Sequence, residues 1–499
     1  MKLAELLERL EYKVVQGDTG IKVGEINNDS RDVREGSVFV CIKGAVSDGH
    51  AYVREAAEKG AVAVVVEREV KAPEGLTLIQ VEDTRYALAL MSAAYYGYPA
   101  EKLKVIGVTG TKGKTTTTYM VKSILEEVGH KVGLIGTIEA RIGDRVLKAG
   151  NTTPESCTIQ KYFAQMVEEG CDIVVMEVSS QGLMLRRTAG IPFEIGIFTN
   201  LGEDHIGPNE HKDFEDYKRC KGLLFRQCRI GIGNADDRWF ADVFRDATCS
   251  VETFGLREEA DLRATDVEKI RDPGAFGVRY HVTGQMDFEV ELGIPGKFSV
   301  YNSLTAIAVC RHFGVPAEKI RRALKRVRVK GRVETVKVSD AFTLLIDYAH
   351  NAMSLASLLA TMREYGPGRI VTVFGCGGNR SRTRRYEMGE VSGKLSDLTI
   401  ITSDNPRFED PRAIMEDIIT GIQKTDGKYI AICDRKEAIR YAIENGQPKD
   451  LIILAGKGHE TYQEIRGVRY PMDERELIRE VLEEWKEEHV RGYHHRHYP

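Results

Sequence analysis

The feature that most constrains the fold is a glycine-rich segment between an apolar run and a helical stretch. The apolar run is Leu103–Val108, and the helical stretch is Thr115–Val128. A strand, such a loop and a helix together are typical of phosphate-binding sites. Glycines let backbone N–H groups turn toward phosphate oxygens, and the helix N-terminus adds partial positive charge. In this pattern a lysine reaches the β- and γ-phosphates, and the next hydroxyl binds Mg²⁺. We therefore predict that ATP and Mg²⁺ bind at Gly110, Thr111, Lys112, Gly113, Lys114, Thr115 and Thr116.

The loop departs from the most common form at one position. The pattern G-x-x-x-x-G-K-[ST] begins with a glycine, and Val108 occupies that place here. A glycine turn that binds no nucleotide is the alternative interpretation. The coincidence of a strand, glycines, a Lys-Thr pair and a helix favours phosphate binding.

The apolar runs predict parallel sheets covered by helices on both faces, because they lack alternation and are separated by helical stretches. A chain of 499 residues corresponds to about three domains. Gly97 and Pro99 interrupt the pattern, and a second α/β series begins near Arg332–Val338. We predict an α/β protein with a small N-terminal α/β domain (1–100), a central ATPase-like domain with a mostly parallel sheet (101–333), and a Rossmann-like C-terminal domain (334–499).

Composition and charge exclude several classes of protein. The net charge of −4 leaves no basic footprint for nucleic acid. No apolar run approaches the roughly 20 residues that cross a bilayer, and acidic residues interrupt Met1–Leu10, so it is not a signal peptide. The nine cysteines include no C-x-x-C pair, which indicates reduced thiols. We expect a cytoplasmic monomer without nucleic-acid partners or membrane insertion, whose His-rich tail (about 491–499) is frayed.

Further short motifs follow one another along nearly the whole chain. They are Asn28–Arg31, Asn151–Pro154, Met176–Ser180, Asn200–His205, Tyr217–Lys221, Tyr301–Asn302, Gly331–Glu334, Asp347–Asn351, Asp404–Arg407 and Gly456–Glu460. Together with the T-G-T-x-G-K-T form of the loop, this order resembles the Mur ligases, and most closely their tripeptide-forming branch. The resemblance implies an ATP-dependent ligase of peptidoglycan precursor synthesis. Such an enzyme adds meso-2,6-diaminopimelate to UDP-N-acetylmuramoyl-L-alanyl-D-glutamate through an acyl phosphate.

Candidate metal ligands lie where two predicted strands end. Glu177 ends one strand and His205 follows another, and ligands bind at the carboxyl ends of strands in open α/β sheets. By itself, Lys221 would be a solvated helical lysine. The resemblance implies instead that it is an N6-carboxylysine, whose carbamate is an anion able to bind Mg²⁺. It further implies a metal set of Thr115, Glu177, His205 and Lys221, and a catalytic set of Lys114, His205 and Lys221.

The resemblance also implies contacts to both nucleotides and to the sugar-peptide. Ser30 would contact uridine in a UDP-binding N-terminal domain, and Asn302 and Arg332 would contact ATP, although alone they would be a capping Asn and a solvated Arg. Hydroxyls and amides suit a polar sugar, and a guanidinium suits a carboxylate or phosphate. Leu185 replaces a residue that is polar in many relatives. The implied sugar-peptide contacts are Asn151, Thr152, Thr153, Ser179 and Arg187.

The C-terminal segment is predicted to select the amine. Diaminopimelate carries one more carboxylate than lysine, so a pocket that prefers it needs a cation such as Arg407 or Arg385. Leaving that arginine unpaired would cost about 1–3 kcal/mol. Pro406 restricts the loop backbone, although an Asn-Pro sequence alone could be a plain turn. The implied contacts are Arg385, Asp404, Asn405, Pro406, Arg407, Gly456 and Glu460.

Several alternatives remain at this stage. The arginine-rich stretch 379–386 leaves Arg384 as an alternative to Arg385, and the third amino acid could be L-lysine. A folylpolyglutamate synthase would use the same chemistry, but Asp29-Ser30-Arg31 resembles a uridine-binding motif. An ATP-gated binding protein would need neither metal-ligand candidates nor an amine-pocket motif.

Overall fold

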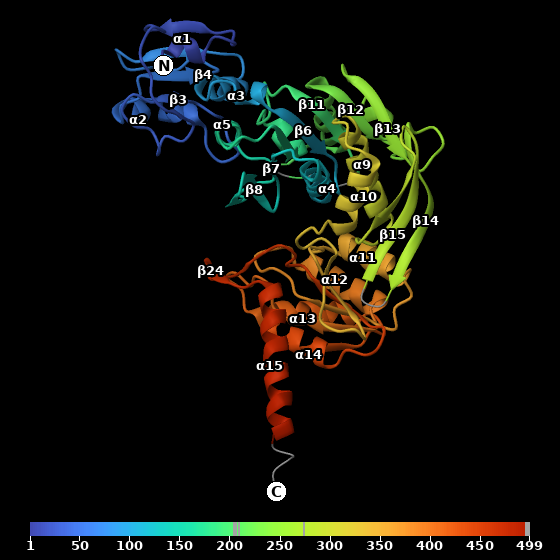
Figure 1. Ribbon diagram of the computed structural model, residues 1–499. Helices are drawn as coiled ribbons and strands as arrows, with labels where there is room; N and C mark the ends of the chain where they lie inside the picture. Colours follow the sequence, from blue (N-terminus) through green and yellow to red (C-terminus); the bar gives the residue numbers. More distant parts are fainter. Residues whose placement is uncertain (203–206, 208–209, 273–274, 495–499) are drawn as a thin grey trace. The chain divides into compact units, whose positions relative to one another are not determined.

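The computed structural model describes residues 1–202, 207, 210–272 and 275–494, and it contains three large sheets and one hairpin (Figure 1). The sheets have five, eleven and six strands in chain order, with helices between the strands. The chain divides into two compact units. The first contains residues 1–264, 282–287 and 301–323, and the second contains residues 265–281, 288–300 and 324–499. The predicted α/β fold class is confirmed, whereas the boundaries at 100 and 333 stay predictions.

The N-terminal sheet has the order β1-β5-β4-β3-β2, in which only β1 is antiparallel to its neighbour. Its central strands are buried on both faces, because Val38 and Val40 belong to one hydrophobic cluster and Phe39 to another. The elements are α1 (Leu3–Leu6), β1 (Lys13–Gln16), β2 (Ile26–Asn27), β3 (Val38–Val40), η1 (Gly49–Tyr52), α2 (Val53–Glu58), β4 (Ala63–Val66), β5 (Thr77–Gln80) and α3 (Thr84–Tyr95).

The central sheet has the order β16-β15-β14-β13-β12-β11-β6-β10-β7-β8-β9. Strands β7, β10, β6, β11, β12 and β13 run parallel, so their carboxyl ends meet at one edge. The strands are β6 (Lys104–Thr109), β7 (Val132–Ile135), β8 (Glu139–Ile142), β9 (Arg145–Lys148), β10 (Ile173–Glu177), β11 (Phe193–Phe198), β12 (Cys228–Asn234), β13 (Ser250–Gly255), β14 (Leu262–Asp272), β15 (Ala275–Gly284) and β16 (Phe288–Leu292). The helices are η2 (Pro99–Lys102), α4 (Lys114–Glu127), α5 (Ser156–Glu168), α6 (Ser180–Met184), α7 (Phe214–Gly222), η3 (Leu223–Arg226), α8 (Phe240–Val243), α9 (Lys297–Arg311) and α10 (Ala317–Arg326).

The C-terminal sheet has the order β17-β18-β22-β19-β20-β21, with only β17 antiparallel. Its strands are β17 (Glu334–Val336), β18 (Thr343–Asp347), β19 (Ile370–Phe374), β20 (Leu398–Ile401), β21 (Tyr429–Ala431) and β22 (Leu451–Ala455). The helices are α11 (Ala352–Arg363), α12 (Arg382–Leu395), α13 (Pro411–Ile422), α14 (Arg435–Glu444) and α15 (Glu474–His494), and the hairpin is β23 (Tyr462–Ile465) with β24 (Val468–Pro471). The motifs predicted to bind the amine follow β20 and β22, which both end at the carboxyl edge of this sheet.

Two further expectations concern the tail and membranes. Helix α15 continues to His494, so the predicted tail begins as helix, and residues 495–499 lie outside the described residues (Figure 1). None of the described helices combines the length and the apolar character needed to cross a bilayer.

Candidate active site

The glycine-rich loop joins β6 to α4 as predicted, and its two glycines are enclosed by neighbouring side chains. Gly110 has φ +147°, and Gly113, which directly precedes α4, has φ +87°. A Cβ on Gly110 would lie 1.9 Å from Thr199 Oγ1, and one on Gly113 would lie 2.4 Å from Asn302 Oδ1. Only glycine fits these backbone positions, so the loop conformation is fixed by both torsion and space.

The side chain of Asn200, which follows the end of β11, binds the loop backbone through two hydrogen bonds. Asn200 Oδ1 accepts from Lys112 N at 2.9 Å, and Asn200 Nδ2 donates to Lys112 O at 2.9 Å. Two ammonium groups bind the loop backbone at the same carbonyl oxygen. Lys114 Nζ donates to Gly110 O at 2.8 Å, and the buried Lys221 Nζ donates to the same oxygen at 2.9 Å. The loop therefore gathers cationic groups where a polyphosphate needs them.

Glu177 lies at the carboxyl end of β10 and is almost completely buried. Its Oε1 accepts from Thr115 Oγ1 at 2.9 Å and from Thr137 N at 2.9 Å, while its Oε2 accepts from Thr137 Oγ1 at 2.9 Å. A hydroxyl of the phosphate loop and a strand-end carboxylate thus meet, as the metal prediction requires. Sequence reasoning missed Thr137, although Gly136-Thr137 directly follows the parallel strand β7.

Four residues predicted to bind the sugar-peptide belong to the same hydrogen-bond network. Thr152 Oγ1 lies 3.0 Å from Thr137 Oγ1, and Thr153 Oγ1 donates to Glu177 O at 2.9 Å. Ser179 N donates to Thr153 Oγ1 at 2.9 Å, and Arg187 Nη1 donates to Thr153 O at 3.0 Å. The network therefore connects the phosphate loop to the candidate substrate residues without a gap.

The remaining predicted residues of the first unit lie outside this network or outside the described residues. Asn151 is exposed, and Leu185 directly follows α6. Ser30 is buried in the N-terminal part, where its carbonyl oxygen accepts from Lys59 Nζ at 2.9 Å. The side chain and backbone N–H of Arg31 lower the pKa of neighbouring Asp29 to about 2. His205 lies outside the described residues.

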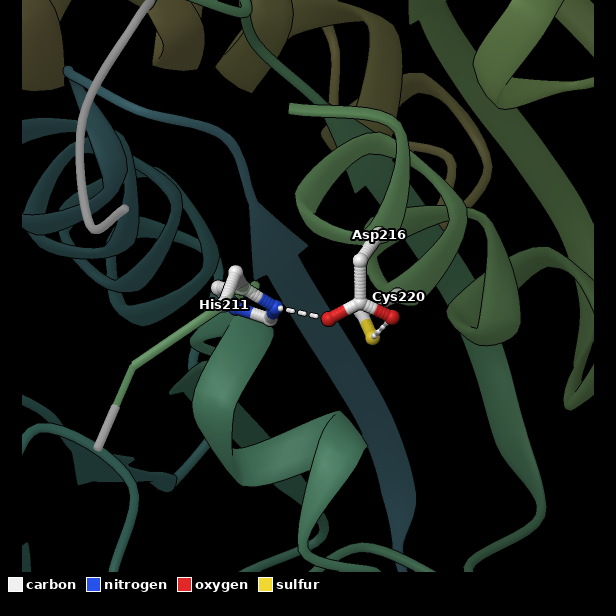
Figure 2. Close-up of side chains that lie close together, drawn as sticks. All are labelled: His211, Asp216 and Cys220. Atoms are coloured by element: carbon white, nitrogen blue, oxygen red, sulfur yellow. Dashed lines mark hydrogen bonds and ion pairs between the residues drawn. The ribbon is translucent and has the colours of Figure 1, made fainter. Parts of the chain in front are cut away.

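Asp216 and Cys220 of α7 form a compact cluster with His211, which precedes that helix (Figure 2). His211 Nδ1 lies 3.1 Å from Asp216 Oδ2, and Cys220 Sγ lies 3.9 Å from Asp216 Oδ1. Arg219 Nη2 also donates to Asp216 at 2.8 Å, so the chain itself supplies the cation. Burial and the nearby Asp216 carboxylate raise the pKa of Cys220 to about 11, which disfavours a metal-binding thiolate. We interpret the cluster as an anchor for α7, which carries Lys221.

The predicted amine-binding motifs meet in the second unit. Asp404 and Asn405 follow β20, Glu460 follows β22, and Asn405 Nδ2 donates to Glu460 Oε2 at 3.1 Å. Lys457 is fully buried between these side chains. Its motif was recognised in the sequence, but no role was predicted for this lysine. The turn around it uses Gly456 at φ +105° and Gly458 at φ +52°.

Arg407 is held in a left-handed backbone conformation with φ +51°. Its N–H donates to Glu464 O at 3.0 Å, and its carbonyl oxygen accepts from Arg466 N at 2.7 Å, so hairpin strand β23 and the turn after it fix the backbone. Its Nη1 donates to Gly378 O at 2.7 Å. Its Nε also lies 3.7 Å from Glu464 Oε2, and 22% of the side chain is exposed.

Arg385, the other predicted carboxylate contact, has a different environment. It is buried on α12, donates to both oxygens of Glu409 at 2.8 and 2.9 Å, and donates to Asp417 Oδ2 at 3.0 Å. Its hydrogen bonds are the largest cause of the lowered pKa of Glu409. Arg384 is only partly buried. Both arginines thus lie beside carboxylates, but Arg385 is buried and paired with two of them, whereas Arg407 has one longer ion pair and a more exposed side chain.

Arg332 lies with an aromatic group in the second unit. Its guanidinium carbon lies 4.9 Å from the centroid of Tyr348, whose ring lies 4.7 Å from that of His459. Burial, followed by the charge of Arg332, lowers the pKa of His459 to about 4. The half-buried Asp347 accepts from Val333 N at 2.9 Å, and desolvation of its carboxylate raises its pKa. This cationic and aromatic surface is chemically suited to a nucleotide.

Three family models match successive parts of the chain. They are described as Mur ligase family, catalytic domain (residues 22–96), Mur ligase middle domain (residues 108–310), and Mur ligase, glutamate ligase domain (residues 331–458). The chain belongs to the Mur ligase family and is an ATP-dependent ligase.

Similar proteins carry one particular name within this family. The chain is 44% identical to UDP-N-acetylmuramoyl-L-alanyl-D-glutamate--2,6-diaminopimelate ligase 1 of Clostridium acetobutylicum, over 97% of this chain and 100% of that protein. It is 43% identical to the ligase named for the same substrates in Caldanaerobacter subterraneus, over 97% and 99% of the two chains. A solved structure of a UDP-N-acetylmuramoyl-L-alanyl-D-glutamate--2,6-diaminopimelate ligase superposes with a TM-score of 0.72 at 26% identity, covering 97% of this chain and 99% of its own.

Proposed function

We propose that this chain ligates meso-2,6-diaminopimelate to UDP-N-acetylmuramoyl-L-alanyl-D-glutamate in peptidoglycan precursor synthesis, using ATP. The observation that carries the proposal is the hydrogen bond of 2.9 Å between Thr115 and Glu177. It joins the phosphate loop to the residues that would hold the dipeptide substrate. Full-length relatives named for this reaction support the same conclusion.

ATP with Mg²⁺ supplies the phosphoryl group that turns the D-glutamate side-chain carboxylate into an acyl phosphate. The enclosed glycine loop and the Thr115–Glu177 pair fit this ligand, because they offer backbone N–H groups, a hydroxyl and a carboxylate together. Lys114 neutralises phosphate charge from the loop. Lys221 is proposed as an N6-carboxylysine that, with Glu177 and His205, holds a second Mg²⁺. Asn302 and Arg332 are proposed contacts to the nucleotide.

The dipeptide substrate is assigned to the residues around the network. Ser30 contacts uridine, and Thr152, Thr153 and Ser179 offer hydroxyls to the sugar and peptide. Arg187 offers a planar guanidinium to an anionic group of the substrate. Asn151 lies exposed beside Thr152, where it can reach the ligand from the open side.

The amine is selected by groups on the second unit. The Arg407 guanidinium receives the far carboxylate of diaminopimelate, and Asp404 and Glu460 receive its ammonium group, with Asn405, Pro406 and Gly456 shaping the pocket. Arg385 reaches the substrate only if it exchanges Glu409 for that carboxylate. The reacting amine attacks the acyl carbon, phosphate leaves, and the new amide loses one proton. We propose that the enzyme acts as a monomer in the cytoplasm.

One assay tests the proposal. Purified protein receives ATP, Mg²⁺ and the UDP-linked dipeptide with either meso-diaminopimelate or L-lysine, and phosphate and tripeptide are both measured. We expect tripeptide with diaminopimelate and little with lysine. Turnover with lysine alone would overturn the choice of amine. ATP binding without product from any amine would indicate a nucleotide-gated binding protein instead.

A further inference from the structure

The buried ammonium group of Lys457 lies among the side chains of the amine pocket. Lys457 Nζ donates to Asn405 Oδ1 at 2.8 Å and to Glu460 Oε2 at 2.7 Å, and it lies 3.8 Å from Asp404 Oδ1. Its side chain is fully buried. Two hydrogen bonds and a longer ion pair thus hold the ammonium group against side chains of its own chain. Lys457 is therefore turned toward its own chain and is not positioned as a direct substrate contact.

The contacts of Lys457 fix which way the Asn405 amide points. Asn405 Oδ1 accepts from Lys457 Nζ and also from Glu464 N, at 2.9 Å. Two donors on one side require the amide oxygen there, so the NH₂ group must face the opposite side. On that side it donates to Glu460 Oε2 at 3.1 Å. Without Lys457, the amide would lose one of the two groups that determine its orientation.

Lys457 and Asn405 together also fix Glu460. Both donate to the same oxygen, Oε2, which leaves Oε1 as the oxygen turned away from them. The Glu460 side chain is 16% exposed, so it keeps a small open surface. A carboxylate with one oxygen tied down presents the other in a defined direction, which lowers the entropy cost of binding an ammonium group.

The charge balance of the pocket leads to the same conclusion. Asp404 and Glu460 bring two carboxylates close together, and Lys457 lies against both. One buried ammonium neutralises one negative charge and leaves one for the cationic end of a substrate. With Lys457 absent, two carboxylates would face each other in a poorly solvated site, which is costly.

We propose that Lys457 is a positioning residue for the amine substrate, acting through Asn405 and Glu460 rather than by touching the substrate. This inference rests on the proposed function, because it assigns the pocket to the amine. The turn that carries Lys457 supports it, since a Cβ on Gly458 would lie 2.6 Å from Tyr348 Cβ and one on Gly456 would lie 3.2 Å from Asp404 Oδ2. The backbone thus approaches too closely for a larger residue on either side of the lysine.

The test compares Lys457→Met, Glu460→Gln and the double variant in the full-length enzyme. Steady-state KM is measured for meso-diaminopimelate and for ATP. We expect Lys457→Met to raise the amine KM at least tenfold while the ATP KM stays within twofold. We expect the amine KM of the double variant to equal the higher of the two single-variant values, because Lys457 acts through Glu460. Lys394→Met is the control, since that lysine is 58% exposed on α12 and pairs only locally with Glu390.

Two results would overturn the proposal. One is an amine KM for Lys457→Met within twofold of the parent enzyme. The other is a double variant whose KM change is the product of the two single changes, since that indicates independent roles. If Lys457→Met does not fold, Glu460→Gln is compared with the double variant, which lacks the charges of both Lys457 and Glu460. Equal amine KM values support the proposal, and a further tenfold rise contradicts it. Failure of the parent enzyme to form tripeptide would instead reject the proposed function.

Discussion

The ammonium groups of Lys114 and Lys221 donate to the same acceptor, the carbonyl oxygen of Gly110, at 2.8 and 2.9 Å. One lysine belongs to the phosphate loop and the other to α7, so residues far apart in the sequence place two like charges around one oxygen. Conversion of Lys221 to a carbamate would replace repulsion with attraction and would provide a ligand for Mg²⁺.

Lys221→Arg tests this idea, because arginine keeps the positive charge but does not supply an amine for a carbamate. We expect turnover to fall about a hundredfold or more, the cost of losing a few kcal/mol of electrostatic stabilisation. Carbon-13 bicarbonate should give a carbamate resonance in the parent enzyme that the variant lacks. Exposed Lys212→Arg is the control and should keep both the resonance and the activity. An unchanged rate for Lys221→Arg would exclude the modification from catalysis.

Glu177→Gln should separate the charge of Glu177 from its place in the network. Glutamine can still accept from Thr115 through its amide oxygen, so the thermal midpoint should change little. The lost negative charge should weaken metal binding, and we expect the Mg²⁺ concentration for half-maximal rate to rise about tenfold or more. Phosphate release measured against Mg²⁺ concentration provides the comparison. A variant with unaltered Mg²⁺ dependence would show that Glu177 holds the loop only.

The two arginines predicted for the amine pocket should behave differently. Arg407→Ala removes a partly open guanidinium, so the amine KM should rise at least tenfold while the thermal midpoint and the ATP KM remain close to the parent values. Arg385→Ala would remove the cation that joins Glu409 to Asp417, although Asp417 keeps Arg382 as a partner, so it should destabilise the fold by about 1–3 kcal/mol. Thermal unfolding and amine kinetics on both variants distinguish the roles. A stable Arg385→Ala with a raised amine KM would instead identify Arg385 as a substrate contact.

Much of the scaffold could be predicted from periodicity. The expected run at Leu103–Val108 matches β6 within one residue at each end, because unbroken apolar runs are typical of buried parallel strands. The edge strand β9 and its neighbour β8 were not predicted, since each has only four residues and gives too short a pattern to recognise.

Residues of the site could be predicted from sequence only where a short motif by itself indicates their role. Thr115 and Glu177 follow from a loop pattern and a strand end. Thr137 and Lys457 do not, because each depends on a partner 40 or 52 residues away in sequence that only the fold brings close. The burial of Arg385 was equally hidden, since its partners Glu409 and Asp417 lie beyond the arginine-rich motif.

The stability of the fold should depend on pH through the side chain of His459. Burial lowers the pKa of His459 to about 4, whereas an unfolded histidine titrates near 6.5, so the unfolded state binds more protons between these values. The contribution of a neutral His459 is therefore complete above pH 6.5 and is lost as the pH falls toward 4, by about 3 kcal/mol in total. His459→Gln does not titrate, so its thermal midpoint should fall less than that of the parent enzyme between pH 7 and about 4.5. Parallel curves for the parent and His459→Gln would mean that His459 is protonated without penalty in the folded state.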